Sequence, residues 1–265
     1  MNIDGPKFLD GQHAVVTGGA KGIGLAVSTA LASAGATVTL MGRDFEAATS
    51  EAKRLANEFS VKTFAQRLDV ADPQSVEDAF QAARDAAGPI TILVNNAGIA
   101  KAAPFLRTTK DMWDQTIAVD LTGVFLCTHQ VLPGMIEKGF GRIVNVGSTA
   151  SHLGLPYVSA YCAAKHGLLG FTRSLAVEIA KTGVTVNAVC PGYTNTDIVS
   201  GAISNIVAKT GKSEEQALKS LTSHNPQGRL IEPDEVANAV SWLCQRNSGS
   251  ITGQSIAIAG GEITL

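Results

Sequence analysis

A tyrosine and a lysine stand four residues apart in the pentapeptide YCAAK, at Tyr161 and Lys165. In a helix, positions i and i+4 share a face, so the phenol and the ammonium would point the same way. A free phenol is a weak base at neutral pH, but a neighbouring cation favours its ionised form. The pair could therefore donate a proton to a carbonyl oxygen or accept one from an alcohol. Taken alone, the spacing also fits a chance pair on a helix surface.

β-Rich runs alternate with helical stretches along the whole chain. The strand runs are mostly apolar without strict alternation, as expected for a parallel sheet covered on both faces. This order predicts an α/β fold with a doubly wound sheet of about seven parallel strands and helices on both faces. The predicted strands span residues 13–17, 36–41, 61–68, 90–95, 141–148, 184–190 and 255–260, and the helices span 22–34, 44–58, 73–87, 109–138, 157–181 and 233–245.

No Pro-, Ser- or Gly-rich linker divides the chain, so residues 1–265 are predicted to form a single domain. Residues 193–228 are an exception to the alternation, because they hold two weak helical patches, near 197–208 and 213–222, and no strand. A segment of that length without a strand is expected to act as a lid over a ligand. We refer to 193–228 as the lid segment.

A glycine-rich turn, TGGAKGIG at 17–24, joins the first predicted strand to a helix. Gly18, Gly22 and Gly24 permit a tight turn and a close backbone approach, and the helix N-terminus that follows favours a pyrophosphate. The spacing is Gly-x-x-x-Gly-x-Gly rather than the general GxGxxG. The stretch therefore fits both a dinucleotide site and a turn that serves packing alone.

Composition and charge narrow the class of partner. With 45% hydrophobic residues, a net charge of -2 and a pI near 6.2, the chain has no basic footprint for nucleic acid or an anionic membrane. The segment 1–12 lacks a signal-peptide pattern and no segment resembles a membrane span, so we expect a cytoplasmic protein. Four cysteines match no metal-ligand spacing, so buried reduced thiols and no metal are expected: Cys127, Cys162, Cys190 and Cys244.

Six segments, in order, resemble the short-chain dehydrogenase/reductase family. Ser148 lies thirteen residues before Tyr161, as the family pattern requires. The resemblance covers nearly the whole chain and implies a seven-stranded Rossmann-type sheet and a nicotinamide-dependent oxidoreductase. The segments are TGGAKGIG, LDVAD at 68–72, NNAG at 95–98, Ser148, YCAAK and PGYTNT at 191–196.

The resemblance also implies a role for each matching residue. Ser148 would hold the substrate oxygen opposite the nicotinamide C4, Tyr161 would exchange its proton, and Lys165 would also bind the nicotinamide ribose. The glycine turn would bind cofactor through Gly18, Lys21, Gly22, Ile23 and Gly24. Further along the chain, Asp69 and Val70 would hold the adenine, Asn95 the adjacent ribose, and Thr194 with Thr196 the carboxamide.

The end of the second predicted strand, TLMGRD, bears on the choice of dinucleotide. NAD-preferring relatives place an Asp where this chain has Gly42, and the cations Arg43 and Lys21 are near in sequence. NADP(H) is therefore the predicted cofactor. NAD(H) remains possible, because a register slip of two residues would turn Asp44 from a helix N-cap into the ribose ligand.

One position departs from the family pattern. Relatives usually carry an asparagine in a stretch like VNLTG, where it binds a water that passes protons to the lysine, whereas this chain has VDLTG with Asp120. If a backbone carbonyl holds that water, aspartate can replace asparagine without loss. If the side chain faces Lys165, its carboxylate stabilises the ammonium. We predict a relay role for Asp120, with a structural carboxylate as the alternative.

The substrate pocket is expected between TASHLGLPYVS at 149–159, Tyr193 and the lid segment. These residues are mostly small and apolar and include no arginine cluster, which disfavours a small dianionic substrate. The predicted substrate contacts are Ser148, His152, Tyr161 and Tyr193, although a lone loop histidine such as His152 is also common on a surface.

The stretch from Ala164 to Gly192 resembles 3-oxoacyl thioester and polyketide ketoreductases, and nearly as well 3-hydroxyacyl and 3-hydroxybutyrate dehydrogenases. Reduction of a 3-oxoacyl thioester or similar ketone with NADPH is the predicted reaction. The alternatives are a catabolic NAD-linked alcohol dehydrogenase and a catalytically silent dinucleotide-binding regulator. Helix 157–181 is apolar nearly all round, the end GGEITL is apolar, and the family pairs such helices between subunits, so we expect a homotetramer.

Overall fold

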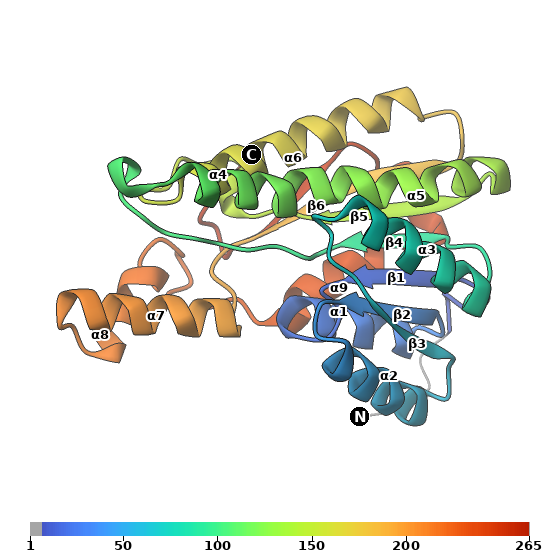
Figure 1. Cartoon of the computed structure of the whole chain (residues 1–265), viewed down its shortest axis with the longest axis horizontal. Coiled ribbons are helices and arrows are strands. Elements are labelled where there is room, and N and C mark those ends of the chain that lie inside the picture. Colours follow the sequence, from blue (N-terminus) through green and yellow to red (C-terminus); the bar gives the residue numbers. More distant parts are fainter. Residues whose placement is uncertain (1–6, 265) are drawn as a thin grey trace.

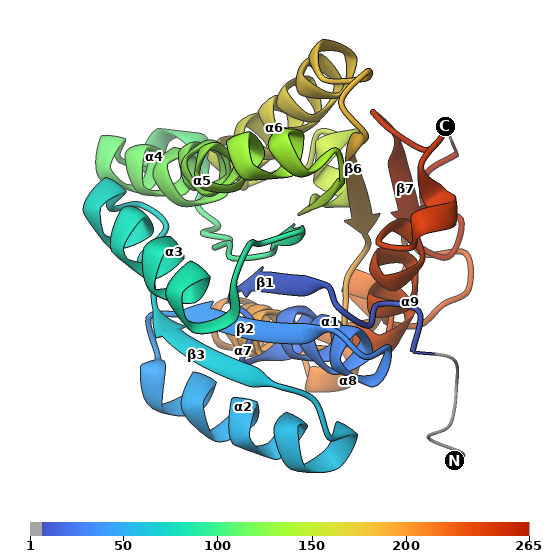
Figure 2. The ribbon, with the colours of Figure 1, turned by 90° about the vertical axis from the view of Figure 1, so that its right-hand side faces the viewer.

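Seven parallel strands form one sheet in the order β3-β2-β1-β4-β5-β6-β7 (Figures 1 and 2). The computed structural model describes residues 7–264. Residues 1–6, half of the segment predicted to lack a signal peptide, and Leu265 at the end of GGEITL lie outside the described residues. The predicted parallel sheet is confirmed, and each strand begins and ends within two residues of its predicted bounds. The strands are β1 (His13–Thr17), β2 (Thr37–Gly42), β3 (Thr63–Arg67), β4 (Ile92–Asn95), β5 (Gly141–Val146), β6 (Val184–Pro191) and β7 (Ser255–Ile258).

Helices follow the strands in the predicted alternation. The predicted helix 109–138 is continuous, but its middle, Ala118–Thr122, is a π-helical turn that the sequence pattern did not predict. Such turns widen a helix locally and are frequent at functional sites. The α-helices are α1 (Gly22–Ser33), α2 (Phe45–Phe59), α3 (Pro73–Ala87), α4 (Lys110–Ile117), α5 (Gly123–Lys138), α6 (Ser159–Glu178), α7 (Asp197–Thr210), α8 (Glu214–Thr222) and α9 (Pro233–Leu243).

Local sequence explains where several helices begin. The Asp44 carboxylate accepts a hydrogen bond from the Ala47 amide, and the Asp72 carboxylate accepts one from Gln74, so both residues cap their helices. Pro73 occupies the first turn of α3, where a missing amide hydrogen costs nothing. Asp44 is thus a helix N-cap, as expected if Gly42 rather than Asp44 stands at the position where NAD-preferring relatives carry Asp.

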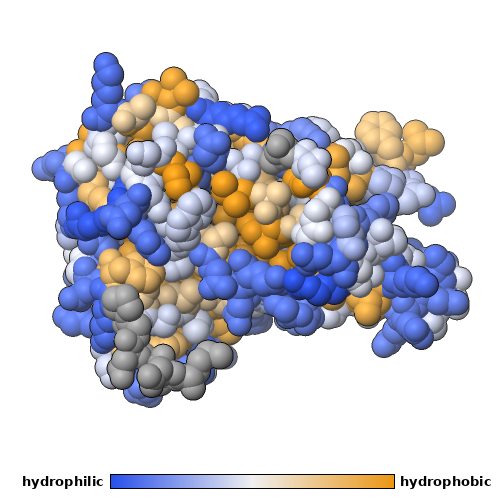
Figure 3. Space-filling view, turned by 180° about the vertical axis from the view of Figure 1, so that it is seen from behind, coloured by the Kyte–Doolittle hydropathy of each residue, from blue (hydrophilic) through white to orange (hydrophobic). Residues whose placement is uncertain are grey.

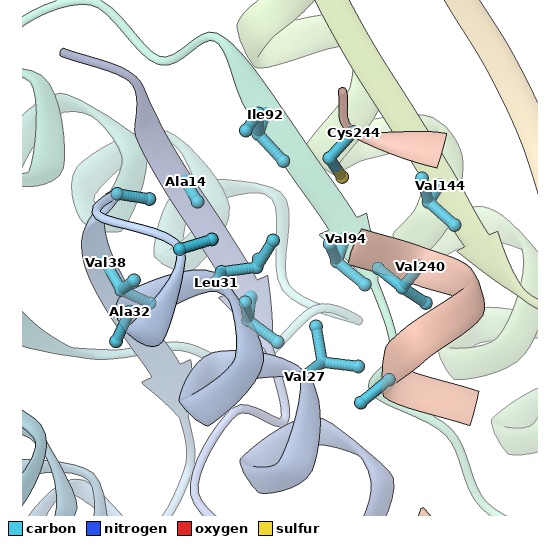
Figure 4. Close-up of a cluster of buried hydrophobic side chains, with 14 of the residues drawn as sticks. Ala14, Val27, Leu31, Ala32, Val38, Ile92, Val94, Val144, Val240 and Cys244 are labelled. Atoms are coloured by element: carbon cyan, nitrogen blue, oxygen red, sulfur yellow. The ribbon is translucent and has the colours of Figure 1, made fainter. Parts of the chain in front are cut away.

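The core has two layers, one on each face of the sheet. Helices α1, α2 and α9 cover one face, where Val27 and Leu31 of α1 and Val240 of α9 meet strand residues (Figures 2 and 4). Helices α3, α5 and α6 cover the other face, where Phe80 and Met135 are fully buried. Burial on both faces explains why the strand sequences are apolar without alternation.

The continuous helix from Lys110 to Lys138 is long and apolar enough, by length and composition, to cross a membrane. The prediction that no segment resembles a span therefore needs this exception. In the fold, however, Cys127, Val131 and Met135 of this helix pack into the core beneath the sheet. Core packing thus explains part of its apolar composition, since 39% of its apolar window is buried.

The strand order changes direction between β1 and β4, because β2 and β3 lie on one side of β1 and β5 to β7 lie beyond β4. Connections leave these two strands in opposite directions, which opens a crevice at their carboxyl ends. All strands are parallel, so the residues that follow β1, β4, β5, β6 and β7 gather at this same edge. This edge positions the candidate site.

Candidate active site

The glycine turn after β1 is held by close backbone packing. Gly18 and Gly22 have φ angles of +64° and +51°, which favour glycine. A Cβ atom at Gly24 would overlap the Gly18 carbonyl oxygen. The Asn96 side chain donates hydrogen bonds to the carbonyl oxygens of Thr17 and Gly18, at 3.0 and 3.2 Å. Asn96 belongs to the NNAG segment, and its role in stabilising this turn was not predicted from the sequence.

The N-terminus of α1 opens onto the crevice beyond the turn. Lys21 occupies the cap position, and among the described residues no side chain accepts a hydrogen bond from the first turn of α1. Uncapped amides at a helix N-terminus attract anions. The Thr196 methyl group lies beside Gly22, so the segment after β6 approaches the turn, and Ile23 follows within the first turn of α1. These residues fit the diphosphate of a dinucleotide.

Lys21 and Asp44 form an ion pair with 2.8 Å between Nζ and Oδ2. The pairing lowers the pKa of Asp44, with a smaller effect from the Ala47 amide. Gly42 leaves the end of β2 open, since a Cβ atom there would meet no described atom within 4 Å, and Arg43 is exposed beside it. Lys21, one of the two cations predicted to face a 2′-phosphate, is thus paired with Asp44, the carboxylate of the alternative register.

Three residues assigned to the adenosine half lie at different depths. Asn95 is buried, and its amide nitrogen donates to Asn145 Oδ1 at 2.9 Å and to Thr128 at 3.2 Å. Its amide nitrogen is therefore engaged by β5 and α5, whereas its Oδ1 atom has no hydrogen-bond partner among the described residues. Asp69 accepts a hydrogen bond from the Ala71 amide, and Val70 packs against Gly123 of α5.

Ser148 follows β5 and begins a short helical turn. Its hydroxyl accepts a hydrogen bond from the Ala150 amide at 3.1 Å, and its own amide donates to the Ser151 hydroxyl at 3.1 Å. This reciprocal arrangement fixes the backbone on both sides of Ser148. The side chain of Ser148 is therefore held at the edge of the sheet where the other predicted residues gather.

Tyr161 and Lys165 lie one turn apart in α6, as predicted. The Lys165 Nζ atom is 5.6 Å from the centre of the Tyr161 ring. Lys165 is buried, and its ammonium donates to the Val146 carbonyl oxygen at 2.9 Å. The tyrosine is only partly buried and remains accessible to a ligand.

Asp120 lies in the π-helical turn and is fully buried. Its Oδ1 atom accepts a hydrogen bond from the Ile99 amide at 3.0 Å and lies 3.8 Å from Lys165 Nζ. A Cβ atom at Gly98 would lie 2.6 Å from Oδ1, so the glycine of NNAG makes room for this carboxylate. The side chain thus faces Lys165, the second of the two arrangements considered.

The electrostatics of Asp120 are set by two opposing effects. Burial raises the pKa of its carboxyl group, while Lys165 and the Ile99 amide lower it by less. Oδ2 has no hydrogen-bond partner among the described residues. A buried carboxyl oxygen without a protein partner is a natural place for a water.

The residues after β6 complete the edge. Thr194 is buried and donates to the Gly192 carbonyl oxygen, and Thr196 donates to the Thr194 carbonyl oxygen at 3.2 Å. Burial raises the pKa of Tyr193, and Glu262 and Tyr161 add smaller effects in the same direction. Tyr193 is therefore within electrostatic range of Tyr161, and its contact with a substrate stays a prediction.

His152 is partly buried after the short helix that Ser148 begins, and its Nε2 atom has no hydrogen-bond partner among the described residues. Burial lowers its pKa, and Arg173 and His166 lower it further. These effects disfavour the charged form of the ring, and a neutral ring suits hydrogen bonding better than anion binding. Nearby Tyr157 is exposed and has a φ of 71°, a strained value for a residue other than glycine.

Glu262 is a site residue that the sequence analysis missed. The location of the GGEITL end in a subunit interface stays a prediction. Within the chain, the Glu262 carboxylate lies beside Gly192, where a Cβ atom would be 2.9 Å from Oε2. Burial raises its pKa, whereas His224 and the Thr149 hydroxyl lower it. The sequence did hold a signal for this site residue, because Glu262 is a charged residue that directly follows Gly260 and Gly261 at the end of an apolar strand.

A parallel sheet with a glycine turn at its switch point, and a Ser, Tyr and Lys set at the same edge, defines a dinucleotide-dependent oxidoreductase. The model of the short chain dehydrogenase family matches residues 12–206, and the chain belongs to this family.

Relatives cover nearly the full length. The chain is 38% identical over 253 residues to the 3-oxoacyl-[acyl-carrier-protein] reductase FabG of Aquifex aeolicus, covering 96% of this chain and 98% of that protein. It is 37% identical to the D-beta-hydroxybutyrate dehydrogenase of Cupriavidus necator, covering 97% of this chain and 99% of that protein. A single-substitution variant of the actinorhodin polyketide ketoreductase, solved with NADPH, superposes with a TM-score of 0.91 at 36% identity, covering 95% of this chain and 97% of that one.

Proposed function

We propose that the protein reduces the ketone of a 3-oxoacyl thioester, or a similar ketone, with NADPH. The observation that carries this proposal is the placement of Ser148, Tyr161 and Lys165 at the same sheet edge as the glycine turn. When bound, the cofactor supplies the hydride. Tyr161 would donate its proton to the carbonyl oxygen as the carbonyl carbon gains that hydride, so that a ketone would become a secondary alcohol.

Each residue has a separate task in this reaction. The Ser148 hydroxyl holds the carbonyl oxygen and stabilises the charge that develops on it. Lys165, fixed by the Val146 carbonyl oxygen, favours the phenolate that remains after proton transfer. Asp120 and a water at its unpartnered oxygen would return a proton through Lys165 to the tyrosine.

NADP(H) is favoured over NAD(H) by the end of β2. Gly42 leaves room for a 2′-phosphate, and Arg43 supplies a cation for it. Asp44 accepts hydrogen bonds from Lys21 and the Ala47 amide, so the carboxylate of the alternative register has other partners. The NADPH in the actinorhodin ketoreductase structure supports the same choice.

We further propose that the protein is a cytoplasmic homotetramer. Each chain would form one domain, with the lid segment over the substrate. The helix pair α7–α8 of the lid segment projects from the body beside the site edge (Figure 1). Large apolar residues are exposed on and near the helices of one layer, and hydrophobic surface gathers in the middle of one face (Figure 3). Patches of this kind mark association surfaces. The most exposed examples are Leu106, Val177, Phe105 and Tyr157.

A catabolic alcohol dehydrogenase is the second candidate, supported by the likeness to D-beta-hydroxybutyrate dehydrogenase. Steady-state oxidation of NADPH and NADH against acetoacetyl-CoA, cyclic ketones and aromatic ketones separates the candidates. We expect acetoacetyl-CoA with NADPH to give the highest kcat/KM. Faster NAD⁺-linked oxidation of 3-hydroxybutyrate would favour the second candidate, and no turnover with cofactor bound would favour a silent regulator.

A further inference from the structure

The chain after β7 turns back toward the site through two glycines. Gly260 and Gly261 have φ angles of +60° and +94°, and a Cβ atom at Gly260 would overlap the Asn225 side-chain oxygen. Asn225 is itself buried and donates to the Arg229 carbonyl oxygen at 2.8 Å. The base of the lid segment is therefore packed against this double glycine, and the next residue, Glu262, is set in a defined direction.

That direction brings the Glu262 carboxylate between the segments that follow β5 and β6. It lies against Gly192, next to Tyr193, and close enough to the Thr149 hydroxyl to be influenced by it. Thr149 directly follows Ser148, and Tyr193 is close enough to Tyr161 for the two phenols to interact. Figure 2 shows β7 beside β6 at this side of the sheet. The carboxylate therefore lies beside the segments that carry Ser148 and Tyr193, where the proposed function places the substrate carbonyl.

We propose that Glu262 makes the site accept neutral 3-oxo compounds, such as esters, thioesters and simple ketones, and reject free 3-oxo acids. A 3-oxo acid carries its carboxylate two carbon atoms from the reacting carbonyl carbon, so it would meet Glu262 in a partly buried site, where like charges repel strongly. An ester or thioester is uncharged at that position. The inference rests on the proposed ketone reduction and narrows its substrate class.

The surroundings of Glu262 are consistent with a charge filter rather than a structural ion pair. Its carboxylate forms no salt bridge among the described residues, and the nearby groups that influence it are His224, Thr149 and Tyr193. The negative charge of Glu262 therefore remains available to act on a ligand.

The test uses acetoacetate and methyl acetoacetate, which differ by one charge at the relevant position. Wild type should reduce the methyl ester and discriminate against the acid. Glu262→Gln should raise kcat/KM for acetoacetate by about tenfold and change that for the ester by less than about threefold. Glu262→Met, which also removes the charge, should shift the preference the same way. Glu77→Gln, on the exposed face of α3, is the matched control and should change neither value.

Calorimetric titration of the same two compounds into NADP⁺-loaded protein provides a readout that needs no turnover, and thermal unfolding shows whether each variant is folded. If neither compound is reduced, the proposed reaction fails. The charge filter is still supported if wild type binds the ester more tightly than the acid and Glu262→Gln binds the two compounds equally. An acid-to-ester ratio that is unchanged in both Glu262 variants overturns the inference, as does equal binding, or no binding, of the two compounds by wild type.

Discussion

The glycine turn after β1 and the helix pair α7–α8 lie at the same end of the sheet but are held in different ways. In the turn, a Cβ atom at Gly24 would overlap backbone, and Asn96 donates to two carbonyl oxygens. In the helix pair, Val199 is the buried residue of α7, and Gly201 has no described atom within 4 Å of a Cβ position. We therefore expect cofactor binding to depend on the fixed backbone of the turn, and α7 to accept an added methyl group at Gly201.

The largest expected effect comes from adding one methyl group in the glycine turn and, for comparison, one in α7. Gly24→Ala should weaken NADPH binding by about a hundredfold, because overpacking against the Gly18 carbonyl forces the turn to move. Gly201→Ala adds the same methyl group in open space within a helix, and should leave NADPH affinity within about twofold and unfolding stability equal or slightly higher. Cofactor fluorescence titration and thermal unfolding measure both. Equal losses in the two variants would remove the contrast.

A smaller effect is expected at Arg43, at the outer limit of the cofactor region. Arg43→Ala should weaken NADPH binding by roughly ten- to a hundredfold and NADH binding much less, because only NADPH brings a 2′-phosphate for a charge-assisted contact. Lys53→Ala on the exposed side of α2 is the control for general loss of positive charge. If Arg43→Ala weakens both cofactors equally, the arginine does not select between them.

The smallest effect concerns the pH profile of Asp120→Asn. The Asp120 carboxylate lies 3.8 Å from Lys165 and places a negative charge near the phenol that Lys165 supports. Its removal makes phenolate formation easier, so the ascending limb of kcat/KM for alcohol oxidation should move toward lower pH, by about one pH unit. Cofactor affinity should change little. A limb that stays in place would show that the carboxylate has no electrostatic part in the reaction.

The fold and the reaction class could be predicted from the sequence because both depend on local patterns. Parallel strands buried on both faces leave apolar runs, and the glycine turn and YCAAK pair act within one turn of chain. Asp44 could be assigned as the cap of α2 for the same reason.

The remaining features depend on contacts between distant segments. The orientation of Asp120 results from a π-helical turn and from the space that Gly98 leaves, and neither has a clear sequence signal. The engagement of Asn95 by Asn145 follows from the pairing of β4 with β5. Glu262 reaches the site because the last strand joins the sheet beside β6, so a residue near the end of the chain becomes a neighbour of Gly192.

The central claim is that Tyr161 exchanges the proton with the substrate oxygen, and Tyr161→Phe tests it most directly. The substitution removes the hydroxyl and keeps the ring beside Lys165. The account predicts that kcat for ketone reduction falls by at least about a hundredfold, while NADPH affinity measured by fluorescence titration stays within about threefold. A variant that keeps the wild-type kcat with normal cofactor binding would contradict the account.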